Sequence, residues 1–232
     1  MVGIDRVYQT VQKILNKEQR GYLPPVEFNL FANQAQNEIF GGYFSLRNYV
    51  PSNDSDYSDI QKNVEEKISF FENEDTLTPT TFNNAAGNTT SSYFAYPSNF
   101  YSLIAISLNN TFATEVSTKD FLYVNKSKLT KPTVKNPIYA RHEGGLVVSP
   151  STGVTEINLS YVRIPAEVNW SYLTVNGKAV YNANTSIDFE LHPSEITELV
   201  LKICQYAGLS TKSIDVAQAA AQKEQQVTQS ER

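Results

Sequence analysis

Apolar positions in the first third of the chain recur every three or four residues, which is the spacing of amphipathic helices. They form three stripes: Ile4, Val7, Val11, Ile14 and Leu15; Phe28, Phe31, Ala35 and Ile39; and Ile60, Val64, Ile68 and Phe71. The Pro-Pro pair at 24–25 suits the start of the second helix, and Ser58 with Gln61 matches a capping box for the third. The Gly-Gly pair at 41–42 implies that the second helix either breaks there or packs closely against a neighbour.

From about Leu77 the pattern changes to short apolar runs separated by turn residues. The strand-like runs cover residues 101–108, 138–141, 146–149, 154–163, 172–175 and 178–181. Asn176 and Gly177 form the strongest turn signal because both residues tolerate positive φ, and Glu143-Gly-Gly predicts a second hairpin turn. The middle of the chain is therefore predicted to be a small antiparallel β domain.

Helical spacing returns after Pro193, which suits a first helical position. The stripe consists of Ile196, Leu199, Val200, Ile203 and Ala207, and Gly208 is placed as a C′ cap. An Ala- and Gln-rich segment, 213–232, has high helix propensity but few large apolar residues. A helix of this kind is marginal alone in water, so we expect it to dock on another subunit. The expected interface residues are Ile214, Val216, Ala217, Ala220, Ala221 and Val227.

These patterns predict an α+β fold. The N- and C-terminal helices form a helical bundle, and an antiparallel β domain, a small sandwich or barrel, is inserted between them. The predicted parts are an N-terminal helical part (1–77), the β domain (78–190), a C-terminal helix packing on the N-terminal helices (191–210) and a C-terminal arm (211–232).

Charge, cysteine content and the lengths of the apolar stretches limit the classes of function that the chain can have. The chain of 232 residues has a net charge of −5, and no run of basic residues stands out, which argues against coating nucleic acid. Its single cysteine, Cys204, lies on the apolar face of a predicted helix and is interpreted as a buried structural thiol. The first residues lack the apolar region of a signal peptide, and no stretch approaches the roughly 18 apolar residues of a membrane span. We expect a soluble protein without a membrane anchor.

Candidate chemistry is sparse. The only histidines are His142, expected at a hairpin tip with Arg141 and Glu143, and His192, expected at a helix start. Neither has the spacing of a metal site or a catalytic motif, so we predict no enzyme activity, cofactor or metal. If the protein is an enzyme after all, the alternative is a hydrolase with its active site around His142.

An acidic segment comes close to a calcium loop. Asp54, Asp56, Ser58 and Glu65 fall at loop positions 1, 3, 5 and 12, but Asp59 stands where glycine is required. We interpret the segment as a solvated acidic linker.

Aromatic residues cluster in and near the β segments and could line a carbohydrate cleft, although in strands such residues are more often core. They are Tyr93, Phe94, Tyr96, Phe100, Tyr101, Phe121 and Tyr123. A carbohydrate- or receptor-binding β module is therefore the alternative function.

Several segments together resemble one class of protein. Residues 96–103 (YPSNFYSL) resemble a P-S-D-F-Y-R-L stretch of tailed-phage head-to-tail connector proteins, with Asn99 where that stretch often carries Asp. Four later segments follow in the order of phage virion structural proteins: 131–133 (KPT), 136–139 (NPIY), 145–150 (GLVVSP) and 159–165 (LSYVRIP). Residues 7–40 are similar to ring proteins of crAss-like phages, and 190–226 look like the terminal helix and arm of this class.

The resemblance implies a structural virion protein in the connector or tail. It implies a ring of twelve copies below the portal protein, assembled in the bacterial host cytoplasm. The expected partners are other copies of the chain, the portal, other tail and ring proteins, and genomic DNA that passes through the channel without sequence-specific binding.

Overall fold

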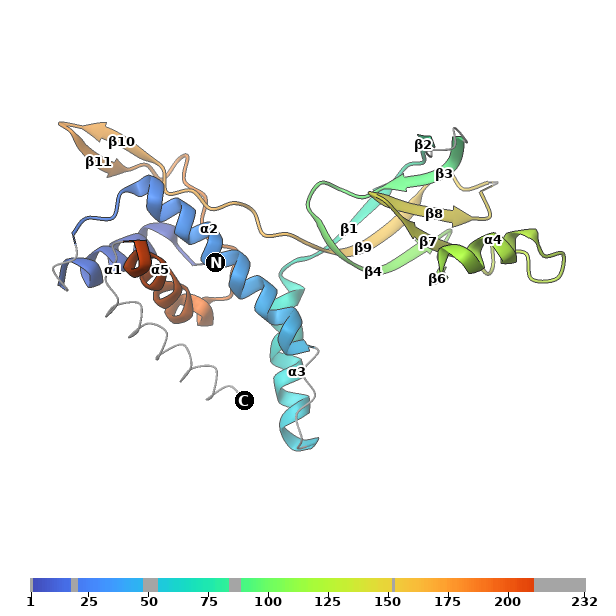
Figure 1. Ribbon diagram of the computed structural model, residues 1–232, viewed down its shortest axis with the longest axis horizontal. Coiled ribbons are helices and arrows are strands. Elements are labelled where there is room, and N and C mark those ends of the chain that lie inside the picture. The colour runs from blue at the N-terminus through green and yellow to red at the C-terminus, as the bar shows by residue number, and fades with distance from the viewer. Residues whose placement is uncertain (1, 18–20, 48–53, 84–88, 152, 211–232) are drawn as a thin grey trace. The chain divides into compact units, whose positions relative to one another are not determined.

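The computed structural model describes residues 2–17, 21–47, 54–83, 89–151 and 153–210. The chain divides into two compact units, which we call the helical unit (Met1–Phe70 with Pro165–Arg232) and the β unit (Phe71–Ile164). The fold is α+β, as predicted, with five α-helices and several antiparallel sheets in the described residues (Figure 1).

The helical unit holds α1 (Ile4–Lys17), α2 (Pro25–Arg47), α3 (Asp54–Ser69) and α5 (Ile196–Ser210), with the 3-10 turn η1 (Pro193–Glu195) before α5. α5 packs against α1 and α2, and α2 packs against α3. The apolar stripes supply the core, because burying one face of each helix removes apolar surface from water. The fully or almost fully buried side chains include Ile4, Val7, Val11, Phe28, Ala35, Leu199 and Ile203.

The Gly-Gly pair neither breaks α2 nor marks close packing. α2 is continuous from Pro25 to Arg47, and a Cβ atom added at Gly41 or Gly42 would meet nothing within 4 Å. Both alternatives drawn from the sequence are therefore wrong.

Two predicted helix ends are also wrong. α3 begins at Asp54, so Ser58 lies inside the helix and cannot be its N-cap. The same helical backbone rules out the loop conformation that a calcium site over 54–65 would require. α5 continues through Gly208 to Ser210, where glycine costs helix stability without ending the helix.

The β unit contains two sheets. The first sheet has the order β1 (Glu72–Leu77), β9 (Ile157–Arg163), β4 (Phe100–Leu108) and β5 (Thr111–Phe112). The second sheet has the order β2 (Thr80–Asn83), β3 (Thr89–Ala95), β8 (Gly145–Ser149), β7 (Ile138–His142) and β6 (Thr114–Glu115). α4 (Thr118–Lys126) follows β6. Both sheets contribute to one core: Phe94, Ile106, Leu108, Tyr139, Leu146, Val148, Ile157, Leu159 and Tyr161. The hairpin predicted around Gly144 is present as β7–β8.

Two boundaries of the units differ from those drawn on the sequence. β1 begins at Glu72 and pairs with β9 along its whole length. The hairpin of β10 (Tyr172–Val175) and β11 (Lys178–Tyr181), turned at Asn176-Gly177 as predicted, belongs to the helical unit. The sequence does not reveal β1, because five of its six residues are polar or charged and its partner residues on β9 lie 80 to 90 positions away.

Three amide side chains on α2 hold the chain that enters the helical unit from β9. Asn29 accepts from the Trp170 N–H (2.8 Å), and its amide nitrogen donates to the Trp170 carbonyl (3.3 Å). Asn33 pairs in the same way with both backbone groups of Val168, at 2.9 Å each. Gln36 donates to the Ala166 carbonyl (2.8 Å). We call this set the amide ladder, because it replaces the backbone partners that a neighbouring strand would provide.

Candidate functional site

The predicted interface residues of the arm lie outside the described residues. Ile214, Val216, Ala217, Ala220, Ala221 and Val227 all fall in 211–232. Their role in subunit contact stays a prediction.

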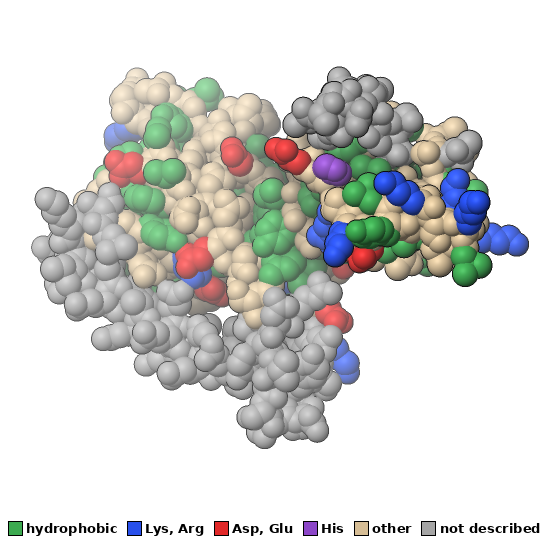
Figure 2. Space-filling view, turned by 45° about the vertical axis from the view of Figure 1, so that its right-hand side comes forward, with side chains coloured by type: hydrophobic (Ala, Val, Ile, Leu, Met, Phe, Trp, Pro, Cys, Tyr) green, Lys and Arg blue, Asp and Glu red, His purple; other side chains and the backbone are tan. Residues whose placement is uncertain are grey.

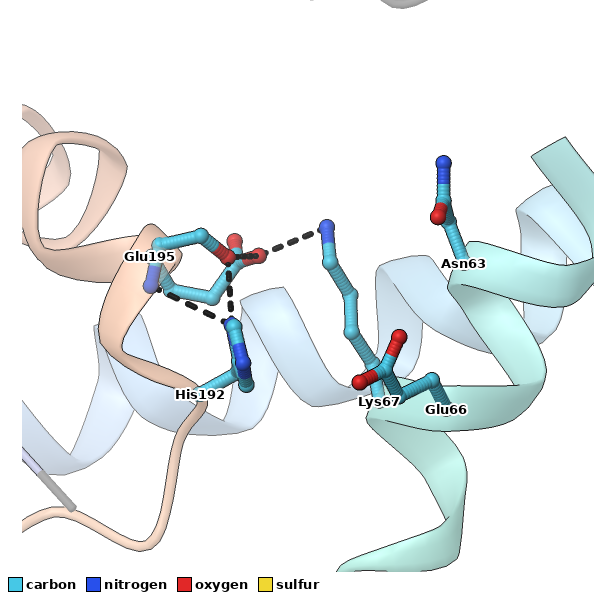
Figure 3. A pocket seen from close by; sticks show the side chains of 6 residues that line it. Asn63, Glu66, Lys67, His192 and Glu195 are labelled. Atoms are coloured by element: carbon cyan, nitrogen blue, oxygen red, sulfur yellow. Dashed lines mark hydrogen bonds and ion pairs between the residues drawn. The ribbon is translucent and has the colours of Figure 1, made fainter. Parts of the chain in front are cut away.

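A polar pocket of 320 Å³ lies between α3 and η1 in the helical unit (Figure 3). Its lining residues are Asn63, Glu66, Lys67, His192, Ser194 and Glu195. Lys67 on α3 forms an ion pair with the buried Glu195, with 2.6 Å between Nζ and Oε1. The Lys67 ammonium also lies 5.7 Å from the centre of the Tyr43 ring, so an aromatic face helps to hold the charge.

Local chain geometry accounts for the polar groups that His192 and η1 contribute to this pocket. His192 is the N-cap of η1, and its Nδ1 accepts a hydrogen bond from the Ser194 N–H (3.3 Å). The Ser194 hydroxyl lies 2.8 Å from that Nδ1 and donates to Glu195 Oε1 at 3.0 Å. The expected role of His192 at a helix start is confirmed.

The grouping of His192, Ser194 and Glu195 has the residue types of a catalytic triad but a different geometry. In a triad the carboxylate binds the histidine, whereas here Glu195 Oε1 accepts from the Ser194 hydroxyl and His192 Nδ1 accepts from the backbone N–H of the same turn. The arrangement is suited to starting α5 and joining it to α3 through the Lys67–Glu195 pair.

His142 is the last residue of β7 and is exposed opposite Gly145, at the hairpin tip that the sequence predicts. The residue after the turn must be glycine, because a Cβ atom at Gly145 would lie 2.2 Å from the Phe94 carbonyl oxygen. The tip is thus shaped by close backbone packing.

Arg141 has a partner that the sequence did not indicate. Its Nε and Nη2 donate to both carboxylate oxygens of Glu115, at 2.8 and 3.1 Å, and the Tyr139 hydroxyl donates to the same carboxylate at 3.0 Å. The hydrogen bonds from Arg141 lower the pKa of Glu115 despite partial burial. Burial, followed by the neighbouring Glu115, raises the pKa of Tyr139 to about 12. This cluster fastens the short strand β6 to β7.

The aromatic residues considered for a carbohydrate cleft mostly pack inside the β unit. Of the seven, only Tyr101 and Tyr123 are exposed, while Tyr93 and Phe94 are buried. The Tyr96 ring stacks on Phe100, with 3.9 Å between the ring centres. They act chiefly as core, which is the role that strands usually give such residues.

The structure also bears on the single cysteine, on metal binding and on membrane-spanning helices. Cys204 is buried, and burial raises the pKa of its thiol to about 11, as expected of a structural cysteine. Within the described part of the chain, no cluster of His, Cys, Asp and Glu could hold a metal ion. None of the helices found there is long and apolar enough to cross a membrane.

The hairpin β10–β11 exposes an apolar face. Leu173, Val175 and Val180 lie on it with exposed fractions of 59%, 51% and 48%, beside the exposed Lys178 that pairs with Val175. On the opposite face, the rings of Tyr172 and Tyr181 lie 5.9 and 5.7 Å from Trp170, which anchors the hairpin to the helical unit. The outer face is therefore a candidate contact surface.

A second exposed surface surrounds α4. This helix has no buried residue, although Ser117 caps it by accepting from the Asp120 N–H at 3.1 Å. The five lysines at 119, 126, 128, 131 and 135 are all exposed, with the exposed apolar residues Leu122, Tyr123 and Leu129 among them. Figure 2 shows Lys and Arg side chains in its right-hand part, over the β unit, with hydrophobic side chains between them. Sequence reasoning missed this surface because the lysines are spread over 17 positions.

No protein-family model matches the chain, and no curated protein matches it.

Proposed function

We propose that this protein is a structural component of a tailed-phage virion that forms a ring in the head-to-tail connector or tail. The order of the segments from 96–103 to 159–165 supports this proposal through their resemblance to connector proteins. In such a ring, the terminal helices act as a bundle and the β unit as an inserted sandwich. Twelve copies surround the channel below the portal protein.

The observation that carries the proposal is the exposed apolar face of β10–β11. A two-stranded hairpin is only marginally stable by itself, and three exposed aliphatic side chains on it lower its solubility without stabilising the subunit. Such a face is accounted for if another subunit covers it. Rings are built by contacts between two different surfaces of neighbouring copies, so each subunit has to present surfaces of this kind.

The net charge of −5 suits a channel wall. Like-charge repulsion between an acidic surface and DNA phosphates allows the duplex to slide instead of binding tightly. The proposed role is mechanical and includes no catalytic step.

Electron microscopy and light scattering of the purified chain, alone and mixed with the portal protein, test the proposal. We expect ring-shaped assemblies, either spontaneous or nucleated by the portal. A chain that stays monomeric under both conditions contradicts the proposed function.

Paired substitutions test whether the hairpin takes part. Leu173→Glu with Val180→Lys replaces two apolar side chains that face each other across the strands with an opposite-charge pair, which keeps the hairpin paired. We expect this variant to remain folded and to lose ring formation. The matched control is Thr174→Glu with Ala179→Lys, the neighbouring cross-strand pair on the other face, and it should still form rings.

The arm is tested by truncation. Deleting residues 213–232 should leave a folded protein that fails to incorporate into rings, because the predicted anchors Ile214, Val216 and Val227 are removed. Ring formation by the truncated chain would show that the arm is dispensable and would leave the hairpin as the contact.

A further inference from the structure

We propose that the lysine surface, formed by α4 and residues 127–135, docks on the acidic outer edge of strand β1 in a second copy of this chain. The inference rests on the proposed function, since it names a surface through which neighbouring copies of a ring would meet.

The burial of α4 gives the first reason. A nine-residue helix is too short to be stable alone in water, and α4 has no buried residue. Phe121 and Val124 are half-buried, but Leu122 and Tyr123 are 59% and 66% exposed, and Leu129 in the following loop is 95% exposed. Covering these three side chains would remove apolar surface from water and would stabilise the helix.

Charge gives the second reason. Residues 117–135 hold five lysines and one aspartate, a net charge of +4 in a chain whose total is −5, so the other residues carry −9. None of the five lysines has an ion-pair partner within 4.0 Å in the part of the chain that the structure describes. The single aspartate, Asp120, accepts a hydrogen bond from the Ser117 hydroxyl at the start of α4. An exposed positive surface on an otherwise negative chain is complementary to other parts of the same chain.

Strand β1, also in the β unit, carries the acidic surface that would receive the lysines. Its sequence is ENEDTL, and Glu72 and Glu74 are exposed. In the described residues β1 is an edge strand paired only with β9, so its outer side is open to another molecule. The Ser160 hydroxyl donates to Glu74 at 3.3 Å, and neither glutamate has a described cationic partner.

The two surfaces belong to different copies. β1 is at the edge of one sheet, whereas α4 packs beside β7 of the other sheet, and Figure 1 shows them at opposite ends of the β unit. One subunit cannot bring its own surfaces together. A contact between two different surfaces repeats from copy to copy, which is the condition for a closed ring.

Nucleic acid is the competing ligand for lysines. Phosphate binding would use the charges but would leave Leu122, Tyr123 and Leu129 exposed, whereas a protein surface would cover them. The mixed apolar and basic character therefore favours a second copy.

Charge reversal in the full chain tests this contact by sedimentation velocity. Lys128→Glu with Lys131→Glu changes two loop residues without altering α4, and Glu72→Lys with Glu74→Lys changes the β1 edge. Each double variant should weaken self-association by about tenfold or more, because attraction becomes repulsion at two positions. An equimolar mixture of the two variants should recover association, since each then offers the other a complementary surface. Lys13→Glu with Lys62→Glu, exposed on α1 and α3, is the charge-matched control for the lysine variant and should associate like the wild type.

Salt gives a second measurement. The self-association of the wild type should weaken between 0.1 M and 1 M salt, because the screening length falls from about 10 Å to about 3 Å. The inference is overturned if the lysine and glutamate variants associate like the wild type, or if their mixture fails to recover association. In either case, ring formation by the wild type would leave the proposed function intact. Loss of duplex DNA binding with unchanged self-association would assign the lysine surface to nucleic acid and overturn the inference. A wild-type chain that never associates, with or without the portal, contradicts both.

Discussion

Single amide side chains on α2 take the place of a neighbouring strand for the segment 166–170. A side-chain amide can donate through its NH2 group and accept at its oxygen, so Asn29 and Asn33 can each match the N–H and C=O of one backbone residue. Asn33 is the middle member and pairs with both groups of Val168, whose side chain is buried. The spacing of Asn29, Asn33 and Gln36 along the helix places them opposite alternate residues of an extended chain.

Removing the middle amide should be costly. We expect Asn33→Ala to lower the free energy of unfolding by about 2–4 kcal/mol, because the N–H and C=O of Val168 both lose their partner in a partly buried site. Urea unfolding followed by circular dichroism measures the change. Asn33→Asp distinguishes the contributions of the two hydrogen bonds to Val168. It keeps an acceptor for the Val168 N–H but places a carboxylate against the Val168 carbonyl.

The matched control lies four residues further along the same helix. Asn37 is exposed and has no described hydrogen bond, so Asn37→Ala should be neutral or stabilising by up to about 0.5 kcal/mol through helix propensity. Equal effects at 33 and 37 would contradict the proposed energetics of the amide ladder.

At the scale of elements, the junction of α2 and α5 depends on ionisation. The Tyr206 hydroxyl on α5 donates to Glu38 on α2, and the buried Lys202 ammonium lies 3.2 Å from the same carboxylate. Burial alone would raise the pKa of Glu38, but the hydrogen bonds from Tyr206 and Lys202 outweigh it and lower the pKa below the usual 4.5. Because the folded pKa is the lower one, the carboxylate stabilises the protein above pH 4.5, and this contribution disappears as the pH falls through the folded value.

Comparison with Glu38→Gln should expose this dependence. The wild type should exceed the variant in unfolding free energy near pH 7, and the difference should shrink steadily below pH 4.5. Urea unfolding at a series of pH values measures it. Glu167→Gln, at an exposed position of the helical unit without a described partner, should differ little from wild type at every pH. A Glu38→Gln difference that is constant with pH would refute the assigned ion pair.

Elements defined by local chemistry were predictable from the sequence, and those defined by distant partners were not. The apolar stripes located four helices, and Asn176 and Gly177, at φ 52° and 75°, located a hairpin turn. β1 was missed because its residues are polar and its pairing with β9 is not visible locally. α4 was missed because no buried stripe marks it, although Ser117 and Asp120 are a recognisable cap.

The candidate surfaces were also predictable only as far as they depend on local sequence. The alternating apolar residues of β10–β11 indicated strands, but the sequence did not show that one face would remain exposed. The lysine surface and the Glu115–Arg141 pair required the fold, which brings together residues from different elements. The amide ladder also required it, because nothing in the sequence relates Asn33 to Val168, 135 positions away.

At the scale of the whole molecule, the β unit has the features of an independently folding insertion. Its core cluster consists of residues between 94 and 161, so both sheets pack on each other within the unit. The chain enters and leaves it at neighbouring points, since the Arg163 N–H donates to the Phe71 carbonyl at 2.8 Å. Both ends of an excised segment would therefore lie close together, as in domains that tolerate insertion into another chain.

The fragment 71–164 should fold alone. We expect a β-type circular dichroism spectrum and a single cooperative urea transition, because the fragment retains the complete core cluster. In that fragment Leu159→Ala, at a fully buried position, should cost about 2–5 kcal/mol of unfolding free energy. Leu129→Ala makes the same chemical change at a side chain that is 95% exposed, so it should change stability by less than about 0.5 kcal/mol. A fragment without a cooperative transition, or with equal losses at both leucines, would show that the β unit depends on the helical unit for its core.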